Sequence, residues 1–530
     1  MRLAVLVAVV ALVLVLCFSK AMFLGLNHDE NQFIAPAVLL ARPGLLPYRD
    51  YPSFHVPNLT FVYALLAQCF SAPFLAARIF CTLCATATVG LVFWEADKKL
   101  AHLGRGLALG LSGALVLLMI CSPVFSKTIG LTWNHDLPLL LTLLGFFCQL
   151  KVARGEGSAP ALLLASGLCV GFAAGARLSF APLLAPFFIG PLLMTARPIR
   201  ERFGLTACVA GGAFAGLLPT LYFAFADTEQ FLFGNFVYPK FSRLWRNLTF
   251  PADESQIAYN ASGYTVEVRN ARTSMDAALK FRYFFKNFAL NNMPVVLAFL
   301  LVGVPGIVAG LWSSRGRKFE ILFFAIVLPF VLWGCIAPTR FHRQYYYALM
   351  PFLILGSAYG LSCFNENVRL SRMGAGLVFA SALAAIVLGA AEYRDSVVAL
   401  VRNSRPWQPM VVHREGKRLR ELCGEGKVLT ISPVPVLEGG LEVYPEFATG
   451  AFAWRSSQLT SPEKRLRLHI IAPGDLERRL AADPARAIFL LNSDPDLEKP
   501  LLEYAQRHDY RSVKFGAGKS LWLAADVGPK

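Results

Sequence analysis

The chain alternates between long apolar runs and short polar segments over its first 390 residues. Each run approaches the roughly 20 residues that an α-helix needs to cross the hydrocarbon core of a bilayer. The pattern predicts a polytopic α-helical membrane protein with about eleven spans. The expected spans are 3–25, 77–95, 106–126, 136–152, 160–177, 179–196, 204–225, 293–312, 319–337, 345–363 and 374–391.

Basic residues cluster in alternate loops between these runs. With eleven spans and a cytoplasmic N-terminus, every cluster falls on the cytoplasmic side, as the positive-inside rule requires. We therefore expect a multi-pass protein of the inner (plasma) membrane, with segments 26–76, 226–292 and 392–530 outside the cytoplasm. The clusters are Lys98, Lys99 and Arg105, then Lys151 and Arg154, then Arg197, Arg200 and Arg202, then Arg315, Arg317 and Lys318, and finally Arg369 and Arg372.

The first outer segment contains two short helical patterns. One starts near Asp29 and stops at Arg42-Pro43-Gly44, and the other runs from about Asn58 to Phe70. A Pro-Gly pair is a common helix stop. Both helices are too short to cross a bilayer, so we expect them to lie in the membrane interface.

The pattern changes again after the last span. Lys427–Ser432, Ala487–Leu491 and Leu521–Ala524 are short apolar runs typical of buried strands, whereas 476–480 and 501–507 have helical patterns. We expect an architecture of two parts, with 1–391 spanning the membrane (outer loops 26–76 and 226–292) and 392–530 forming a small extracytoplasmic α/β domain. Because its charge is nearly balanced and no catalytic cluster is recognisable in it, we expect residues 405–530 to hold no catalytic base.

Composition agrees with a membrane protein. The chain is 55% hydrophobic and 16% charged, against about 25% charged for soluble domains. Its net charge is +17, and residues 391–530 hold 21 Lys and Arg against 18 Asp and Glu. The positive excess therefore belongs mostly to the membrane loops, which argues against nucleic acid as a partner.

An acidic pair directly follows the first span, in Asn27-His28-Asp29-Glu30. One interpretation is a helix start, with Asn27 as the cap and the two acids in the first turn. Charge is costly in hydrocarbon, so acidic residues at a membrane rim need a reason. The second interpretation is therefore functional: one of the acids is a general base that faces a lipid-borne substrate. Adjacent helical residues point about 100° apart, so only one of the two acids can face a given target.

Further polar groups gather at the same predicted face from separate loops. Each group taken singly is explained by the polar residues that commonly occur at helix ends, but the shared location of the groups favours one site. The motifs are Leu46-Pro47-Tyr48-Arg49-Asp50-Tyr51, Phe54-His55-Val56-Pro57-Asn58, Trp133-Asn134-His135-Asp136, Gly175-Ala176-Arg177-Leu178-Ser179 and Phe341-His342-Arg343-Gln344-Tyr345-Tyr346-Tyr347.

The order of these motifs resembles a known family. Asp29-Glu30, the Leu-Pro-Tyr-Arg-Asp turn at 46–50, the short apolar helix, and Ala76-Ala77-Arg78 at the start of a span are similar to the GT-C glycosyltransferases. The resemblance is to rhizobial galacturonosyltransferases, the lipid A aminoarabinose transferase and protein O-mannosyltransferases. It covers roughly 1–360 by layout and is specific mainly at 27–80.

The resemblance implies transfer of a sugar from a polyprenyl-phosphate donor during cell-envelope lipopolysaccharide or glycan synthesis. It implies Asp29 as the base and Asp136 as a second acid, and we expect Glu30 to orient the loop. The family often has Lys-Pro-Pro where this chain has His55-Val56-Pro57, and Lys where it has Arg177. A neutral imidazole holds phosphate more weakly than an ammonium does. The expected phosphate-binding residues are Arg49, His55, Arg177, Arg243, Arg343 and Tyr345, with Arg246 and Arg340 as further cationic candidates.

The residue types suit such a reaction. A lipid phosphate is a good leaving group, so the site needs a carboxylate to take the acceptor's hydroxyl proton and cations to stabilise the phosphate. Arginine binds phosphate oxygens bidentately. Direct attack on the anomeric carbon inverts its configuration. The acceptor could be a lipid, a glycan or a protein; no cofactor is firmly implied, and a divalent cation could assist.

Other functional classes stay open at the level of sequence. The main alternative is a transporter or a lipid or glycolipid flippase, which would place charges at mid-depth in its spans. A non-enzymatic assembly or receptor protein and another lipid-dependent transferase are further alternatives. The spans contain no Asp or Glu clearly away from an edge, and no repeated halves are apparent. These features favour the transferase.

Reporter fusions test the predicted topology. Because every basic cluster falls on one face, fusions at Lys99, Arg200 and Lys318 are expected to report a cytoplasmic location, and a fusion at Lys530 an external one. A cytoplasmic C-terminus would contradict the orientation and, with it, the external site.

Overall fold

The computed structural model describes residues 2–41, 45–244, 257–265, 277–312, 318–338, 342–364, 367–491, 494–516 and 518–525. The chain forms two compact units, each assembled from three stretches of sequence. The first unit comprises Met1–Phe23, Arg78–Leu218 and Ser274–Arg405, and the second comprises Leu24–Ala77, Pro219–Thr273 and Pro406–Lys530. The division at 391/392 expected from the sequence stays a prediction.

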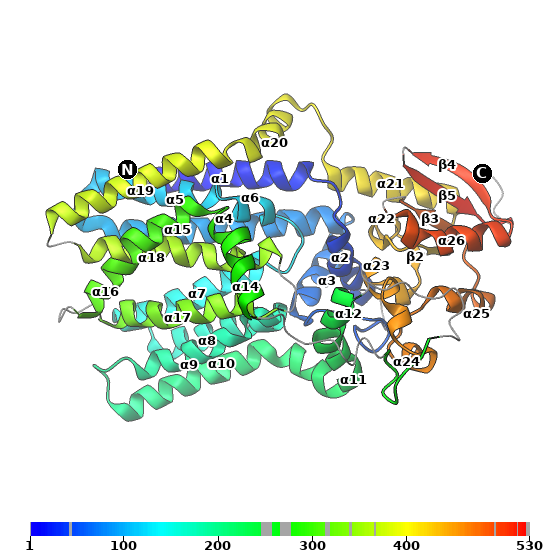
Figure 1. Ribbon diagram of the computed structural model, residues 1–530, viewed down its shortest axis with the longest axis horizontal. Helices are drawn as coiled ribbons and strands as arrows, with labels where there is room; N and C mark the ends of the chain where they lie inside the picture. The colour runs from blue at the N-terminus through cyan, green and yellow to red at the C-terminus, as the bar shows by residue number, and fades with distance from the viewer. Residues whose placement is uncertain are drawn as a thin grey trace. The chain divides into compact units, whose positions relative to one another are not determined.

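Nine helices in the described residues are long and apolar enough to cross a membrane. Their lengths and composition make this a multi-pass membrane protein, and the long helices of the first unit run beside one another (Figure 1). They are α1 (Arg2–Phe23), α4 with η1 (Pro73–Leu103), α7 (Asp136–Ala153), α8 (Ala159–Ala176), α10 (Ile199–Ala226), α15 to α16 (Met293–Trp312), α17 (Lys318–Ile336), η8 with α18 (Arg343–Cys363) and α19 (Val368–Gly389).

Two more of the expected spans form shorter apolar helices. They are α5 (Arg105–Ile120) and the pair η2–α9 (Leu178–Leu192). The count of eleven therefore stays a prediction, whereas the helical architecture is confirmed. The remaining helices of the first unit are α6 (Pro123–Thr128), α14 (Ala277–Phe284), η6 (Phe285–Ala289) and α20 (Ala391–Arg402).

Small residues let α8 and α10 approach closely. Gly167 and Gly171 on α8 face Gly212 and Gly216 on α10, two small-xxx-small pairs. A methyl group placed on Gly171 would lie 2.3 Å from the carbonyl oxygen of Ala213. Van der Waals contact between backbones stabilises helix pairs in lipid, where apolar burial alone gives no driving force.

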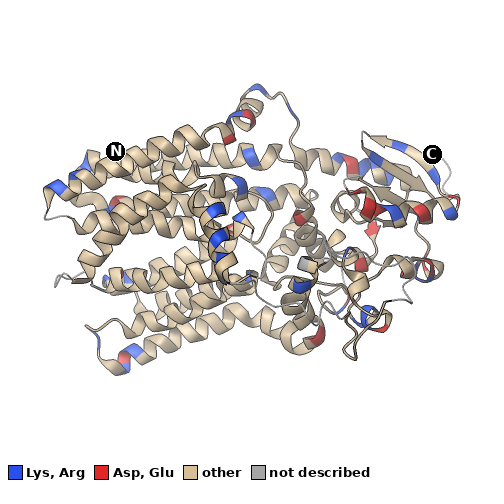
Figure 2. Ribbon diagram, in the orientation of Figure 1, with Lys and Arg blue, Asp and Glu red and all other residues tan. Residues whose placement is uncertain are grey.

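The helix α18 (Leu349–Cys363) is the most enclosed of the spans. In its segment, Arg343–Cys363, 89% of the membrane-spanning window is buried. Phe352 packs in the same core as Phe146, whose ring stacks on Phe323 with centroids 5.2 Å apart. Lys, Arg, Asp and Glu are sparse along the middles of these helices and gather near their ends (Figure 2).

The second unit contains a five-stranded sheet. The strand order is β2-β1-β3-β5-β4, with β1 parallel to β2 and β3, and β5 antiparallel to β3 and β4. Tyr444, Trp454 and Leu501 belong to the core that packs with buried residues of these strands. The strands are β1 (Lys427–Leu429), β2 (Glu442–Val443), β3 (Ala487–Leu490), β4 (Arg511–Gly516) and β5 (Lys519–Leu523).

Helices from three parts of the sequence complete the second unit. The first loop supplies α2 (His28–Ala41) and α3 (Asn58–Cys69), which confirms both expected short helices. The C-terminal strands near 427, 487 and 521 are also confirmed, whereas β2 and β4 were not expected. The other helices are α11 (Thr228–Leu232), η3 (Phe233–Val237), α12 (Tyr238–Leu244), α21 (Gln408–Cys423), α22 (Pro433–Glu438), η9 (Pro445–Phe447), α23 (Ala451–Trp454), η10 (Ser457–Leu459), α24 (Pro462–Arg467), η11 (Pro473–Asp475), α25 (Leu476–Ala482) and α26 (Pro495–Arg507).

The α8–α10 contact gives a stability prediction. Gly171→Leu puts a branched side chain against the backbone of Ala213, so we expect a destabilisation of about 1–3 kcal/mol, measured by thermal unfolding of the purified protein. Gly113→Leu on α5 is the matched control, because nothing lies within 4 Å of a Cβ there. Equal unfolding temperatures for the two variants would contradict the close packing.

Candidate functional site

Arg177 is the central residue of a polar cluster in the first unit. It follows the last residue of α8 and leaves the helix in an extended conformation, with φ −155° and ψ 116°. Its Nε donates to Ser179 Oγ at 2.8 Å, and its Nη1 donates to Asn134 Oδ1 at 3.1 Å. The same Nη1 lies 2.7 Å from His135 Nδ1. Two loops far apart in sequence thus meet at one guanidinium.

The charge of Arg177 is enclosed. Its relative exposure is 8%, and within the described part of the chain none of its contacts is a carboxylate. The ring of Tyr345 lies 5.0 Å from the guanidinium carbon and offers a cation–π contact. Burying a charge without a counter-ion is costly, so this arrangement favours the entry of an anion.

The cavity beside Arg177 is small. Its volume is about 10 Å³, which is enough for roughly one water molecule. Arg177, His135 and Tyr345 supply polar groups, and residues of η2, α17 and α18 supply apolar ones. A phosphate group needs more room than this, so side chains must move for it to enter.

Asp136 occupies the first position of α7 and is 1% exposed. Its Oδ1 accepts a hydrogen bond from the Tyr347 hydroxyl at 2.6 Å, and its Oδ2 accepts one from the Gly130 backbone N–H at 3.1 Å. The ring of Tyr347 also meets that of His135 edge-on at 6.0 Å. Asp136 therefore ties the start of α7 to the segment that carries Tyr345.

Arg343 begins η8, the short 3-10 helix that leads into α18. The Arg343 side chain is exposed, unlike that of Arg177. The structure thus brings Asp136, Arg177 and Tyr345 together, with Arg343 two residues from Tyr345. Asn134 and His135 were noted as part of a motif but not expected as contacts of Arg177.

Asp29 and Glu30 lie at the start of α2 in the second unit. Glu30 is fully buried, and its Oε2 accepts the backbone N–H of Asn27 at 2.9 Å. Asn27 Oδ1 accepts the backbone N–H of Asp29 at 2.8 Å, as the helix-start interpretation predicts. The Asp29 side chain is 26% exposed, with Oδ1 3.1 Å from His28 Nε2. Glu30 fixes the turn, and Asp29 is the more accessible acid.

Arg49 and His55 lie elsewhere in the first loop. Arg49 Nη2 is 2.8 Å from Asp50 Oδ2, which also accepts the backbone N–H of Leu46. Burial acts to raise the pKa of the Asp50 carboxyl, but these hydrogen bonds outweigh it and hold that pKa below its ordinary value. His55 Nε2 lies 3.0 Å from Gln32 Oε1.

The expected site residues are divided between the units. Asp136, Arg177, Arg343 and Tyr345 belong to the first, whereas Asp29, Glu30, Arg49 and His55 belong to the second. Their assembly into one site stays a prediction. The side chain of Arg243, and Arg246 and Arg340 altogether, lie outside the described residues.

The C-terminal segment holds α2 in place, which the sequence did not predict. The Asn31 Oδ1 on α2 accepts the backbone N–H of Val434 on α22 at 3.2 Å in a buried setting. The ring of His28 stacks against Phe452 with centroids 5.7 Å apart. Residues more than 400 positions apart thus support the turn that carries Asp29.

The other end of α22 is also anchored. Glu438 accepts the backbone N–H of Phe74 at 2.7 Å, and its second oxygen lies 2.7 Å from His413 Nδ1. Burial raises the pKa of the Glu438 carboxyl. Both contacts involve well-enclosed groups, so they fix α22 between α21 and the residues that follow the first loop.

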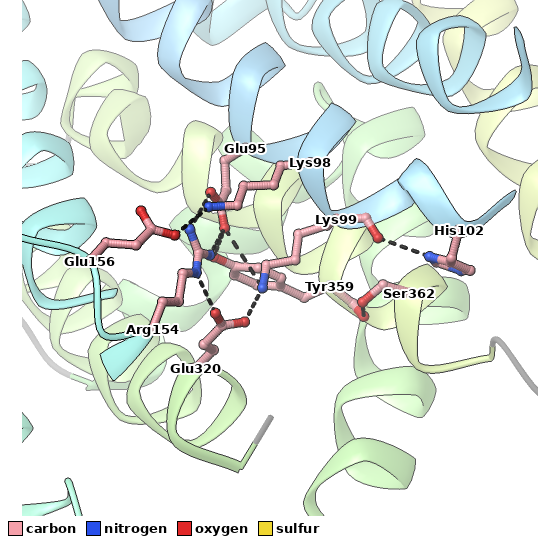
Figure 3. A network of polar contacts seen from close by, with 9 residues as sticks. All are labelled: Glu95, Lys98, Lys99, His102, Arg154, Glu156, Glu320, Tyr359 and Ser362. Atoms are coloured by element: carbon pink, nitrogen blue, oxygen red, sulfur yellow. Dashed lines mark hydrogen bonds and ion pairs between the residues drawn. The ribbon is translucent and has the colours of Figure 1, made fainter. Parts of the chain in front are cut away.

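A second ionic cluster joins four helices of the first unit. Arg154, after α7, binds Glu95 of α4 at 2.5 Å and Glu320 of α17 at 2.6 Å. Lys99 also pairs with Glu320, and the Tyr359 hydroxyl of α18 donates to Glu95 at 3.0 Å (Figure 3). The sequence placed Lys99 and Arg154 in loops, but α4 continues to Leu100 and the side chains of both are largely enclosed.

Among the described residues, no three His, Cys, Asp or Glu side chains lie close enough together to hold a metal ion. The residues that are present instead offer guanidinium, imidazole and hydroxyl groups, which suit an anion.

Comparison with known proteins gives matches at the level of structure. No family model and no curated protein matches the sequence. ArnT from Cupriavidus metallidurans bound to undecaprenyl phosphate aligns over 100% of this chain and 99% of that chain, with TM-score 0.60 and 13% identity. The same protein in the apo state gives TM-score 0.56 with 13% identity and the same coverage.

A more distant match is the apo oligosaccharyltransferase of Archaeoglobus fulgidus, with TM-score 0.47, 13% identity, and coverage of 93% of this chain and 70% of that chain. The ArnT alignments extend over both chains almost completely, so the likeness includes the helical part and the C-terminal part alike. The protein described here therefore has the GT-C fold of ArnT.

Proposed function

We propose that this protein is a glycosyltransferase that moves a sugar from a polyprenyl-phosphate donor to an acceptor outside the cytoplasm. The fold shared with ArnT, which was crystallised with undecaprenyl phosphate, supports this reaction class. The acceptor is a lipid, a glycan or a protein. Attack of the acceptor hydroxyl on the anomeric carbon, opposite the phosphate, inverts that centre.

One observation carries the proposal: the enclosed guanidinium of Arg177 contacts no carboxylate among the described residues. A lipid-borne phosphate supplies the missing anion at the end of a membrane helix. The planar guanidinium can hold two phosphate oxygens at once. Asn134, Ser179 and Tyr345 orient it, so little reorganisation is needed as charge develops on the leaving phosphate.

The acceptor side of the reaction needs a base. Asp29 follows the first span and keeps part of its carboxylate accessible, whereas Glu30 and Asp136 are engaged by backbone or tyrosine donors. In the proposed reaction Asp29 takes the acceptor's hydroxyl proton while the C–O bond to the phosphate breaks. Asp136 acts as the secondary acidic group that holds the Tyr347 segment beside Arg177.

A turnover assay tests the reaction class. Purified protein in nanodiscs is supplied with a panel of radiolabelled polyprenyl-phosphate sugars and membrane acceptors, and transferred label is counted. Transfer from at least one donor, with release of polyprenyl phosphate, is the expected result. Movement of labelled lipid between leaflets without any transfer would instead favour a flippase.

Substitution of Arg177 tests whether its side chain binds phosphate or only extends its charge to the membrane interface. Arg177→Lys keeps the charge but loses the two-point contact, so we expect turnover to fall by at least about tenfold, as charged hydrogen bonds are worth roughly 1.5–3 kcal/mol. Arg343→Lys, at an exposed position, should cost less. Arg282→Lys on α14 is the matched control, being exposed and near a helix end. Full activity of Arg177→Lys would contradict the phosphate contact.

Substitution of Asp29 tests the base. Asp29→Asn should lower turnover by about 10²–10⁴-fold, the usual contribution of general-base help, with little change in unfolding temperature. Glu30→Gln should cost less activity. Asp496→Asn, an exposed acid at the start of α26, is the control.

The pattern of losses assigns the role. An active Asp29→Asn protein beside an inactive, folded Asp136→Asn protein would move the base to Asp136. If both variants keep their activity, the mechanism is wrong.

A further inference from the structure

The second unit contains a cavity of about 270 Å³ that is separate from every residue assigned above. It lies among η9, α24, η11 and α25, on one flank of the C-terminal sheet's core. Leucine, isoleucine and alanine side chains form part of its wall. Its polar lining consists of Glu446, Arg465, His469, Asp475, Arg478 and Arg479.

Most of these charges are already arranged in pairs. The Arg465 side chain is 1% exposed, and its Nε donates to Asp475 Oδ2 at 2.8 Å. Arg479 Nε donates to Glu446 Oε1 at 2.5 Å. Three guanidinium groups face two carboxylates, so the lining carries one positive charge in excess. A network of this kind holds the walls rigidly.

Two groups in this network have binding capacity left. The Glu446 Oε2 atom is buried and has no hydrogen-bond partner among the described residues, which is costly for a carboxylate unless a donor enters the cavity. Arg478 pairs with Asp475 at 3.1 Å, but its side chain is 63% exposed, so this pair is weak and readily exchanged.

The backbone at the cavity is also unusual. His469 has a φ of +51°, in the left-handed region that residues other than glycine seldom adopt. Such conformations cluster at ligand-binding sites, where the surrounding structure over-determines them. Buried Leu468 and Ile470 flank His469 on either side and hold the turn in that conformation.

We propose that this cavity is a subsite for a single sugar ring that carries an acidic group. Glu446 Oε2 accepts a hydrogen bond from a ring hydroxyl, and Arg478 exchanges its surface ion pair for the acidic group of the sugar. The apolar wall contacts the C–H face of the ring. Guanidinium and carboxylate groups side by side match the donor and acceptor needs of neighbouring hydroxyls.

The size and charge of the cavity select this ligand class. Small-molecule pockets usually span about 300–1,000 Å³, so 270 Å³ suits one ring and not a lipid chain or an oligosaccharide. The excess positive charge favours an anionic ring over a neutral one. The buried carboxylate oxygen requires a donor, which a ring hydroxyl supplies, and the apolar wall requires C–H groups to contact, which an inorganic anion lacks.

The cavity belongs to the same compact unit as Asp29. If the protein is the proposed transferase, the bound ring is part of the acceptor glycan, and this one statement rests on the proposed function. The binding itself does not depend on turnover, so it can be tested whether or not transfer is observed.

The test is a binding titration with full-length protein in nanodiscs. Methyl β-D-glucuronide is the probe, methyl β-D-glucoside is the neutral arm and inorganic phosphate is the anion arm, with saturation-transfer NMR as the readout. We expect the glucuronide to bind, the glucoside to bind more weakly, and phosphate not to displace the ring at equal concentration.

Point variants locate the binding. Glu446→Gln keeps an acceptor for Arg479 but replaces the unpaired oxygen, and Arg478→Gln removes the exchangeable cation; each should weaken glucuronide binding roughly tenfold. Glu477→Gln is the matched control, because Glu477 pairs with Arg507 and His508 and does not line the cavity. Unfolding temperatures confirm that the variants are folded.

Each result is decisive. Binding that both variants weaken and the control leaves unchanged supports the subsite. No glucuronide binding, or binding that neither variant changes, overturns it. Equal binding of the neutral glucoside overturns the assignment of an acidic ligand. Full displacement of the glucuronide by phosphate overturns the assignment of a sugar ligand. A transferase assay that fails while glucuronide binds refutes the proposed function alone.

Discussion

A charge enclosed among apolar helices needs a partner, and the membrane part of this protein is organised around that constraint. At the end of α7, Arg154 pairs with Glu95 and Glu320. At the start of α7, Asp136 accepts hydrogen bonds from Tyr347 and from a backbone N–H. Arg177 differs from Arg154, since none of its contacts in the described part of the chain is a carboxylate.

The same contacts tie α7 and α18 together at both ends, directly at one end and through Glu95 of α4 at the other. Tyr347 precedes α18 and binds Asp136, while Tyr359 lies within α18 and binds Glu95, the partner of Arg154. Directional polar bonds at two points fix the register of two helices more strictly than apolar packing does, because apolar contacts tolerate sliding. The position of Tyr345 beside Arg177 depends on this register.

The sequence predicted what depends on local pattern. The helices α2 and α3, most of the spans and the strands near 427, 487 and 521 follow from apolar periods and from stop signals such as Pro and Gly. It did not predict β2, which has two residues, or β4, a mostly exposed edge strand whose partner is the adjacent β5.

The site was predictable only in part. Arg177 and Asp136 attracted attention because they are titratable groups at helix ends. The contact between Arg177 and His135 could not be foreseen, because it depends on how two helices pack. Arg154 was expected only in a basic loop for the same reason, because its partner Glu95 lies on another helix.

The discontinuity of the second unit bears on how the chain is made. Asn31 on α2 accepts a hydrogen bond from Val434, which lies 403 residues later in the chain. The helix α2 therefore leaves the ribosome long before this partner has been synthesised. During the intervening elongation, all of the later spans must be inserted while the first outer loop waits incomplete. Early helices with late partners are vulnerable to proteolysis and to misassembly. The last step in the biogenesis of this protein is therefore the completion of the second unit, in which the last 125 or so residues pack against the first outer loop.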